Sequence, residues 1–177
     1  MRIIGGTSKG RALHPPKGLP VRPTTDFAKE GLFNILNNQM DLEGIQVLDL
    51  FAGTGNMSLE FASRGARVTA VDSHAKCCAW MKTAAAQLQL PLQIHKVDVF
   101  SFLNHPAQGY DLIFADPPYE LPNLLQLPEI IFSKGWLSPN GLLIVEHGKQ
   151  TQTEGLSHFS RERKYGNVHF SFFSQEV

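Results

Sequence analysis

The sequence predicts an α/β fold: a doubly wound, mostly parallel sheet of seven strands that ends in an antiparallel hairpin. Between residues 45 and 147, short apolar runs rich in β-branched residues alternate with segments of helical periodicity. The apolar runs are almost continuous, which is typical of parallel strands covered by helices on both faces. After residue 157 apolar and polar residues alternate on both sides of Gly166 and Asn167, which indicates a hairpin.

The first 40 residues are expected to form a basic extension and a helix that belong to the same domain as residues 41–177. Glycines and prolines are frequent up to Pro23 and predict short strands and turns. The run from Thr24 to Asp26 is a helix start signal, so we expect one amphipathic helix of about 14 residues after it. At 177 residues the chain has the length of one domain, without room for a second large one.

The remaining elements follow from the same periodicities. Parallel strands are expected at residues 45–52, 67–72, 92–99, 110–116 and 141–147, and helices at 56–64, 74–88 and roughly 122–135. The hairpin strands are expected at residues 158–165 and 168–174. This order brings the carboxyl ends of the parallel strands to one edge of the sheet, where such folds bind their ligands.

Charged residues are distributed unevenly, although the formal net charge is zero. Residues 1–30 contain six basic and two acidic residues, a net charge of +4, and the rest of the chain carries −4. A basic arm on a mildly acidic body is suited to holding nucleic-acid phosphates. A solvated terminus without a partner is the alternative that the charges leave open.

The cysteine content and the hydropathy indicate a soluble, cytoplasmic protein. The two cysteines, Cys77 and Cys78, are neighbours in a predicted helix, where their side chains diverge, so we expect both to be reduced. No apolar run approaches the roughly 18 residues that a membrane span needs, and the start lacks the apolar stretch of a signal peptide.

A glycine-containing turn follows the first strand and predicts a ligand site. Its candidate ligand-binding residues are Asp49, Phe51, Gly53, Thr54 and Gly55. The glycines let the backbone turn sharply and approach a ligand closely. Asp72, followed by Ser73, closes the second strand and is placed to accept hydrogen bonds from ribose hydroxyls, or else to cap the next helix. The turn alone would also suit a dinucleotide oxidoreductase, although Ser58 stands where that interpretation expects a third glycine.

Asp98 lies at the end of the third predicted strand in the same way, with Val99 and Phe100 after it. The carboxylate could accept a hydrogen bond from an adenine amine while the apolar neighbours pack against the ring. A purely structural role is almost equally compatible with this residue taken alone.

The run Asp116-Pro117-Pro118-Tyr119 ends the fourth strand and carries the strongest chemical signal. Two prolines fix φ and hold the preceding residue extended, so the carboxylate and the adjoining carbonyl are rigidly placed at the sheet edge. These acceptors suit an amine conjugated to a base, and the aromatic ring suits stacking on that base. The four residues are therefore the candidate catalytic residues.

With these motifs the chain resembles the class I S-adenosylmethionine-dependent methyltransferases that modify exocyclic amino groups, which have a Rossmann-like fold. The segments RIIGGTSKGR, RPTTDFAKEGLFNIL, EHGK and KYGN further resemble the bacterial small-subunit ribosomal RNA guanine-N2 methyltransferase family. The likeness covers nearly the whole chain. Phe27 and Gly31 depart from it, since a basic residue and an alanine are expected there, and the stretch between Glu146 and His158 is short.

The resemblance implies the roles of the candidate residues. Asp49 and Gly53 to Gly55 would line the methionine part of S-adenosylmethionine, Asp72 would hold the ribose and Asp98 the adenine. The target base would meet the residues from Asp116 to Tyr119, and S-adenosylhomocysteine would be the product. Candidate RNA contacts are Arg2, Lys9, Arg11, Arg22 and Thr24, although Arg22 and Thr24 could instead reach the cofactor carboxylate.

The resemblance also implies a partner, which is ribosomal RNA or a small-subunit ribonucleoprotein. We expect a monomer that needs neither a metal nor a membrane. A DNA adenine-N6 or cytosine-N4 methyltransferase is the nearest alternative, because the same corner serves those amines, but about 21 residues between Tyr119 and Gly141 leave no room for a target-reading domain. A non-catalytic RNA-binding module with a vestigial pocket and a nicotinamide oxidoreductase are weaker alternatives.

Overall fold

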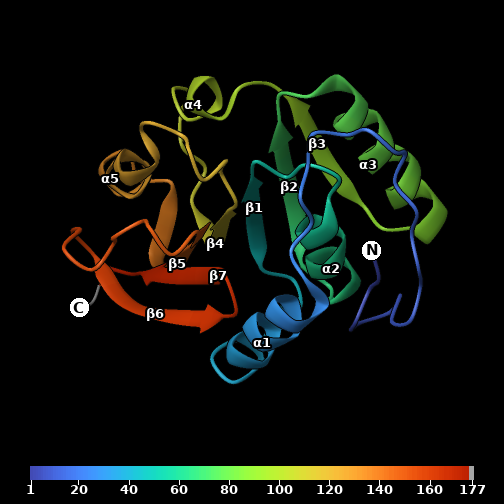
Figure 1. The fold of residues 1–177 in the computed structure, drawn as a ribbon, viewed down its shortest axis with the longest axis horizontal. Coiled ribbons are helices and arrows are strands. Elements are labelled where there is room, and N and C mark those ends of the chain that lie inside the picture. The colour runs from blue at the N-terminus through green and yellow to red at the C-terminus, as the bar shows by residue number, and fades with distance from the viewer. Residues whose placement is uncertain (176–177) are drawn as a thin grey trace.

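The computed structural model describes residues 1–175 and contains a seven-stranded sheet with helices on both faces (Figure 1). The strands are β1 (Gln46–Leu50), β2 (Arg67–Asp72), β3 (Leu92–Lys96), β4 (Tyr110–Ala115), β5 (Leu137–His147), β6 (Phe159–Tyr165) and β7 (Val168–Phe173). The helices are α1 (Asp26–Asn37), α2 (Asn56–Ser63), α3 (Ala75–Leu88), α4 (Val99–Phe102) and α5 (Leu127–Ser133), with a 3₁₀ turn η1 (Leu124–Gln126) before α5.

The strand order is β3-β2-β1-β4-β5-β7-β6. Strands β1 to β5 are parallel, and β7 and β6 are antiparallel additions at one edge. The prediction of a mostly parallel, seven-stranded sheet with an antiparallel hairpin is therefore confirmed. The chain winds outward in opposite directions from β1 and from β4, so the crevice for a ligand is expected at the carboxyl ends of these two neighbours.

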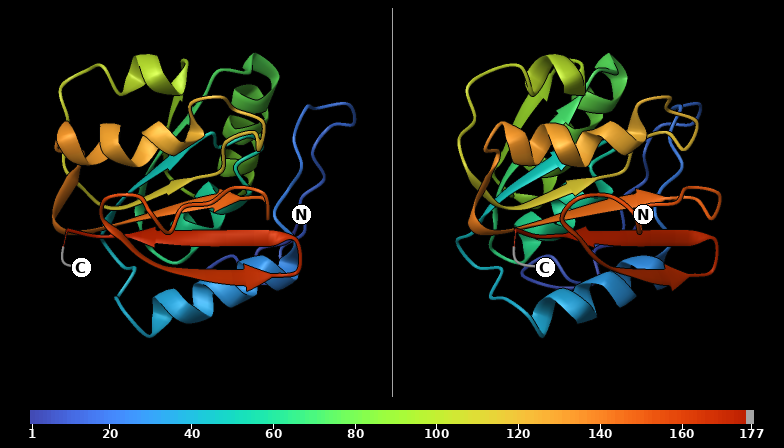
Figure 2. Two further views of the ribbon diagram at one scale, coloured as in Figure 1. Left: turned by 60° about the vertical axis from the view of Figure 1, so that its left-hand side comes forward. Right: turned by 90° about the vertical axis from the view of Figure 1, so that its left-hand side faces the viewer.

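Two apolar cores lie on opposite faces of the sheet. Figure 2 shows α1 below the sheet and α5 above it. On the lower face α1 and α2 bury Phe33 and Phe61 against the sheet residues Phe114 and Phe170. The upper core surrounds Trp136 and is closed by α4 and α5. The near-continuous apolar strands therefore have the double cover that their sequence predicts.

The N-terminal residues pack against α2 and α3. Arg2 and Ala12 form an antiparallel bridge, and Ile3 and Leu13 are buried between the two helices. The backbone amides of Ile4 and Gly5 donate to the Glu60 carboxylate at 3.0 and 2.8 Å. This part of the arm is thus an integral piece of the packed structure.

The largest differences from the expected boundaries concern three elements. The third strand ends at Lys96, because Asp98 caps the short helix α4 by accepting from the Ser101 amide at 3.0 Å. The helix expected over 122–135 is divided into η1 and α5, with Pro128 in the first turn of α5. Strand β5 begins at Leu137, earlier than expected, where it pairs with Tyr110 before a register shift.

No helix among the described residues is long and apolar enough to cross a membrane. Both cysteines are buried free thiols on α3, as expected from their adjacency.

Candidate functional site

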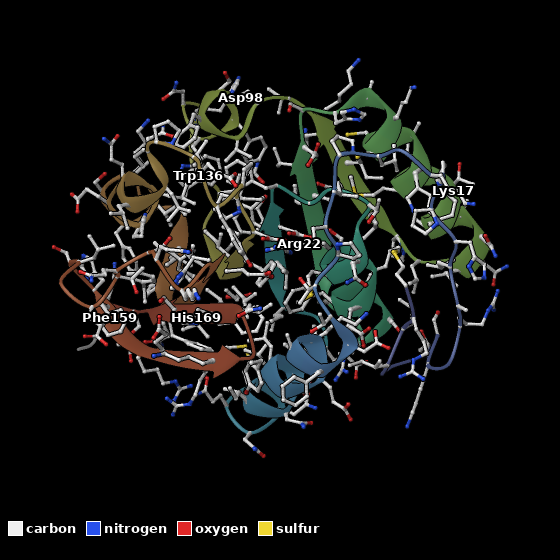
Figure 3. The ribbon with its side chains drawn as sticks, in the orientation of Figure 1. Lys17, Arg22, Asp98, Trp136, Phe159 and His169 are labelled. Carbon is white, nitrogen blue, oxygen red and sulfur yellow. The ribbon has the colours of Figure 1, made fainter. Side chains whose placement is uncertain are left out.

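A cavity of about 490 Å³ opens at the carboxyl edge of the sheet, at the point where the strand order reverses. Its walls come from the ends of β1, β2, β4 and β5 and from residues 20–24, which cross in front of the sheet. Figure 3 shows Arg22 of this segment near the centre of the sheet. The volume lies within the range of small-molecule sites, roughly 300 to 1,000 Å³.

The glycine turn after β1 forms one wall and has a backbone that few residues adopt. Phe51, Gly53 and Gly55 have φ values of 59°, 58° and 79°. A Cβ on Gly55 would lie 2.7 Å from Cγ of Met81, and one on Gly53 would lie 3.1 Å from Cγ1 of Val21. Glycine is therefore required at position 55 by both conformation and space.

Asp49 is buried beneath this turn. It accepts a hydrogen bond from the Ser58 hydroxyl, and burial raises its pKa to about 7. Ser58 is the residue that stands where a dinucleotide turn would have its third glycine. Since a glycine could not donate to Asp49, the serine supports this arrangement and argues against the oxidoreductase alternative.

Asp72 joins the turn to β2 and also lines the cavity with Ser73. Its Oδ2 accepts from the Gly53 amide and its Oδ1 from the His74 amide, both at 2.8 Å. Each carboxylate oxygen offers two acceptor positions. The structural role and the predicted ribose-binding role are therefore compatible.

Asp116 lies at the end of β4 on the opposite side of the cavity from Asp72, with Pro117, Pro118 and Tyr119 beside it. Its amide donates to the Leu50 carbonyl at 3.2 Å, which fixes the corner to β1. The pKa of Asp116 is raised well above its usual range, first by burial and then by the negative charges of Glu146 and Asp49, while Arg22 opposes the shift. The carboxylate accepts no hydrogen bond from residues 1–175, so its acceptor positions face the cavity.

Glu146 is a cavity residue to which the sequence analysis gave no role. It lies in β5 and is 3% exposed. Its Oε2 accepts from the Thr24 hydroxyl at 2.8 Å and its Oε1 from the Tyr119 hydroxyl at 3.2 Å. Burial raises its pKa. A second carboxylate thus lies next to Asp116. In the sequence Glu146 is part of the EHGK segment, where its place in an apolar strand is typical of a core position.

Arg22 and Thr24 contact the cavity residues Tyr119 and Glu146. The Arg22 guanidinium lies 4.5 Å from the centre of the Tyr119 ring, a cation–π distance, and its charge offsets those of Asp116 and Glu146. Thr24 is buried, and its hydroxyl donates a hydrogen bond to the Glu146 carboxylate. In this structure Thr24 therefore positions a carboxylate, and its hydroxyl is not directed at an RNA phosphate.

Asp98, Val99 and Phe100 do not line the cavity. Asp98 is exposed and caps α4, at the upper rim in Figure 3. Val99 is buried in the upper core, and the Phe100 ring meets the Phe51 ring at 6.4 Å, edge to face. The contact between Phe51 and Phe100 links this segment to the cavity wall, and the adenine-binding role stays a prediction.

The basic arm presents fewer free charges than the sequence suggested. Lys29 is fully buried on the inner side of α1, where its Nζ pairs with Glu60 at 3.0 Å, and Arg2 pairs with Asp26 at 3.2 Å. Asp26 is already counted in the net charge of +4 but Glu60 is not, so the burial of Lys29 against Glu60 makes this value overstate the positive surface. Lys9 and Arg11 are exposed and form no ion pair within residues 1–175.

A family model described as Conserved hypothetical protein 95 matches residues 1–174. The chain belongs to this family. Ribosomal RNA small subunit methyltransferase D of Escherichia coli K12 is 32% identical over 184 residues, covering 100% of this chain and 91% of the relative. These matches confirm the family resemblance found in the sequence.

Solved structures agree with the fold. A hypothetical protein of Thermus thermophilus superposes with a TM-score of 0.87 at 26% identity, covering 98% of this chain and 99% of that chain. The T. thermophilus 16S rRNA N2 G1207 methyltransferase, solved with AdoMet and guanosine, has a TM-score of 0.73 at 21% identity and covers 90% of this chain and 46% of that one. At 21% identity, the match to this methyltransferase shows that the two chains share a fold.

In this member of the Conserved hypothetical protein 95 family, Phe27 and Gly31 of α1, the two residues that depart from the expected family sequence, both lie against Tyr165. A Cβ on Gly31 would lie 2.2 Å from Cε1 of Tyr165, and the Phe27 ring meets the Tyr165 ring at 5.6 Å, edge to face. The expected alanine at position 31 therefore does not fit beside this tyrosine.

Proposed function

We propose that the chain is an S-adenosylmethionine-dependent methyltransferase that methylates the exocyclic N2 amine of a guanine in small-subunit ribosomal RNA. One observation carries the proposal: the corner from Asp116 to Tyr119, a second carboxylate at Glu146 and the glycine turn line a single cavity. A relative with 32% identity is named Ribosomal RNA small subunit methyltransferase D, which favours this RNA. A fold neighbour that acts on N2 of a guanine was solved with AdoMet and guanosine.

The residues around the glycine turn fit the cofactor. Gly53 keeps the wall free of a side chain beside Val21, and the spare acceptor positions of Asp72 suit two adjacent ribose hydroxyls. Phe51 provides an apolar face next to them. When bound, S-adenosylmethionine supplies an electrophilic methyl group on a sulfonium, so the chain's own residues need to position the amine and to accept a proton.

Asp116 is suited to both tasks. Its carboxylate has free acceptor positions in the cavity, and the prolines hold it in place, so it can accept a hydrogen bond from the amine without reorganising. Once methyl transfer has begun, the amine becomes acidic and can pass its proton to this carboxylate. The raised pKa of Asp116 makes it a better proton acceptor than an ordinary aspartate.

Glu146 supports guanine as the target. Guanine presents N1–H next to its N2 amine, whereas adenine presents a lone pair at N1 next to its N6 amine. Two neighbouring carboxylates can accept from the amine and from N1–H of guanine, but one of them would face the adenine lone pair. An unmatched buried polar group costs about 1–3 kcal/mol, enough for roughly tenfold to hundredfold discrimination.

The target base must leave its stack to enter the cavity. Tyr119 and Arg22 line the cavity, and both an aromatic ring and a guanidinium plane can stack on a base. They would replace part of the stacking that the base loses.

Mass spectrometry of nucleosides from ribosomal RNA, with and without the gene, tests the proposal. Loss of one N2-methylguanosine from small-subunit RNA, restored by the wild-type gene, is the expected result. Loss of an N6-methyladenosine with all N2-methylguanosine retained would instead establish the adenine alternative. The purified protein should then methylate RNA from the deletion strain at the same nucleotide.

A further inference from the structure

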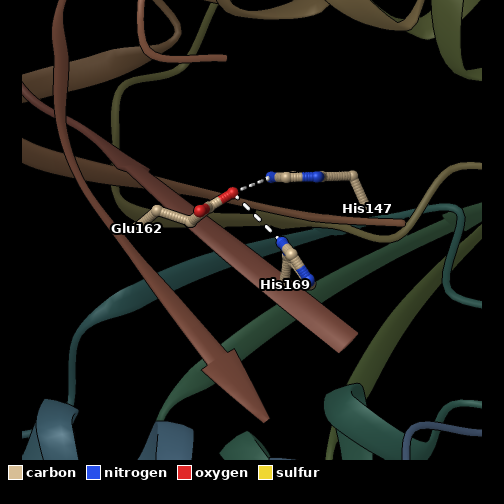
Figure 4. Close-up of side chains that lie close together, drawn as sticks. All are labelled: His147, Glu162 and His169. Carbon is tan, nitrogen blue, oxygen red and sulfur yellow. Dashed lines mark hydrogen bonds and ion pairs between the residues drawn. The ribbon is translucent and has the colours of Figure 1, made fainter. Parts of the chain in front are cut away.

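Three side chains with metal-binding atoms meet on the C-terminal part of the sheet, away from the cavity. They are His147 of β5, Glu162 of β6 and His169 of β7 (Figure 4). Their ligand atoms all lie within 4.8 Å of one another. His147 and His169 are direct partners in the antiparallel pair of β5 and β7, so their side chains share one face of the sheet.

The distances are long for hydrogen bonds and suitable for a shared metal ion. Oε1 of Glu162 lies 3.3 Å from Nδ1 of His169 and 3.5 Å from Nε2 of His147. Charge-assisted hydrogen bonds are shorter, about 2.7–2.9 Å. Two ligand atoms bound tetrahedrally to Zn²⁺ at about 2.0–2.1 Å are about 3.3–3.4 Å apart, which matches these separations.

The orientation of His147 also favours a cation. Its Nδ1 faces the Gly148 carbonyl at 2.9 Å, and because a carbonyl only accepts, Nδ1 carries the ring hydrogen. The lone pair of this tautomer is therefore on Nε2, which faces Glu162 at 3.5 Å and the Ser171 hydroxyl at 2.7 Å. A backbone carbonyl that fixes the opposite nitrogen is the usual support of a metal-binding histidine.

We propose that His147, Glu162 and His169 form a structural site for a divalent transition metal ion, and that this ion is Zn²⁺. Two imidazole nitrogens and one carboxylate oxygen are a known zinc ligand set, and imidazole disfavours Mg²⁺ and Ca²⁺. A water can take the fourth position, because the buried Ser171 hydroxyl, 2.7 Å from Nε2 of His147, lies at hydrogen-bond distance from that ring. The ion ties β5 to the hairpin.

This site is separate from the proposed transfer chemistry, for which no metal is expected. Its ligands are 15 and 7 residues apart in sequence, on three strands, and lack the short spacing of a metal motif. The ion would hold the end of β5, where Glu146 immediately precedes His147.

The test uses the full chain with any polyhistidine tag removed, stripped by a chelator and titrated with Zn²⁺ by calorimetry. We expect about one ion per chain and a higher Tm with Zn²⁺. Co²⁺ should give the visible absorption of a tetrahedral site with nitrogen and oxygen ligands. Absence of binding, or a cobalt–thiolate band that places the ion at the cysteines, would overturn the proposal.

Variants make the assignment specific. Glu162→Gln preserves shape, and His169→Ala removes a ligand; each should weaken Zn²⁺ binding at least tenfold, the lower end of what even supporting residues contribute. His14→Ala, which changes an exposed histidine, is the matched control and should bind like the wild type. Should His169→Ala not fold, Glu162→Gln decides alone: unchanged affinity in that variant contradicts the site. These readouts do not depend on methyl transfer.

Discussion

We expect the replacement of Asp116 by asparagine to separate the proposed methyl transfer from cofactor binding. The change keeps the shape of the side chain but removes its charge and its ability to accept a proton. Proton acceptance by a positioned group contributes about 10²–10⁴ in rate, so kcat should fall by that factor, or about 3–5.5 kcal/mol in activation free energy. Because the carboxylate accepts no hydrogen bond within residues 1–175, the substitution breaks no internal hydrogen bond.

The same geometry predicts the effect on stability. Burial and the charges of Glu146 and Asp49 disfavour an ionised Asp116, so the neutral asparagine should leave Tm unchanged or raise it. Affinity for S-adenosylmethionine, measured by calorimetry, should stay within about threefold, since Asp72 and the glycine turn are untouched. Glu129→Gln on the exposed side of α5 is the control. A parallel loss of cofactor affinity and turnover, or nearly normal turnover, would refute the role given to Asp116.

Four further predictions rest on particular side chains. Glu146→Gln should lower kcat/KM for the guanine substrate about tenfold to hundredfold, measured with methyl-labelled cofactor; an unchanged value removes this residue from base recognition. Between about pH 4 and pH 7 thermal stability should fall as pH rises, because folded Asp49 keeps its proton to about pH 7 whereas an unfolded aspartate loses it near 3.8. Asp49→Asn should flatten this dependence in scanning calorimetry, and an equally steep profile in the variant would exclude Asp49 as its source. Lys29→Met should destabilise the fold by about 1.5–3 kcal/mol in urea unfolding, because it removes one of the two cations that pair with buried Glu60 and leaves Arg64 as the other; a destabilisation below about 0.5 kcal/mol would contradict the buried pair. The double variant Lys9→Ala, Arg11→Ala should weaken RNA association and reduce its salt slope, by about 0.7 to 0.9 for each phosphate that these side chains neutralise; identical slopes would exclude these residues from docking the RNA.

The salt experiment uses substitutions because the N-terminal arm cannot simply be removed. Ile3 and Leu13 are buried against α2 and α3, and two amides of the arm donate to Glu60. Deleting residues 1–20 would expose this core and leave the Glu60 carboxylate with fewer donors. Loss of RNA binding in a truncated chain would therefore not report on the exposed charges.

The fold class and the chemical motifs could be predicted from the order of the residues. Strand and helix positions follow from the spacing of apolar residues along a few neighbouring positions, which is a local property. The two prolines after Asp116 dictate an extended backbone wherever they occur, and the glycines at 53 and 55 permit a left-handed turn. The parallel order then brings these segments to one edge without any knowledge of side-chain contacts.

The hydrogen-bond and ion-pair partners of the polar residues, by contrast, are determined by the three-dimensional packing. Thr24 and Glu146 are 122 positions apart and become hydrogen-bonded because the segment before α1 crosses the end of β5. In the sequence Lys29 is counted as part of a basic arm, yet in the structure it forms a buried ion pair with Glu60. His147, Glu162 and His169 meet through strand pairing. Side-chain contacts between distant segments depend on the register and packing of whole elements, whereas local periodicity reports only which face of an element is buried.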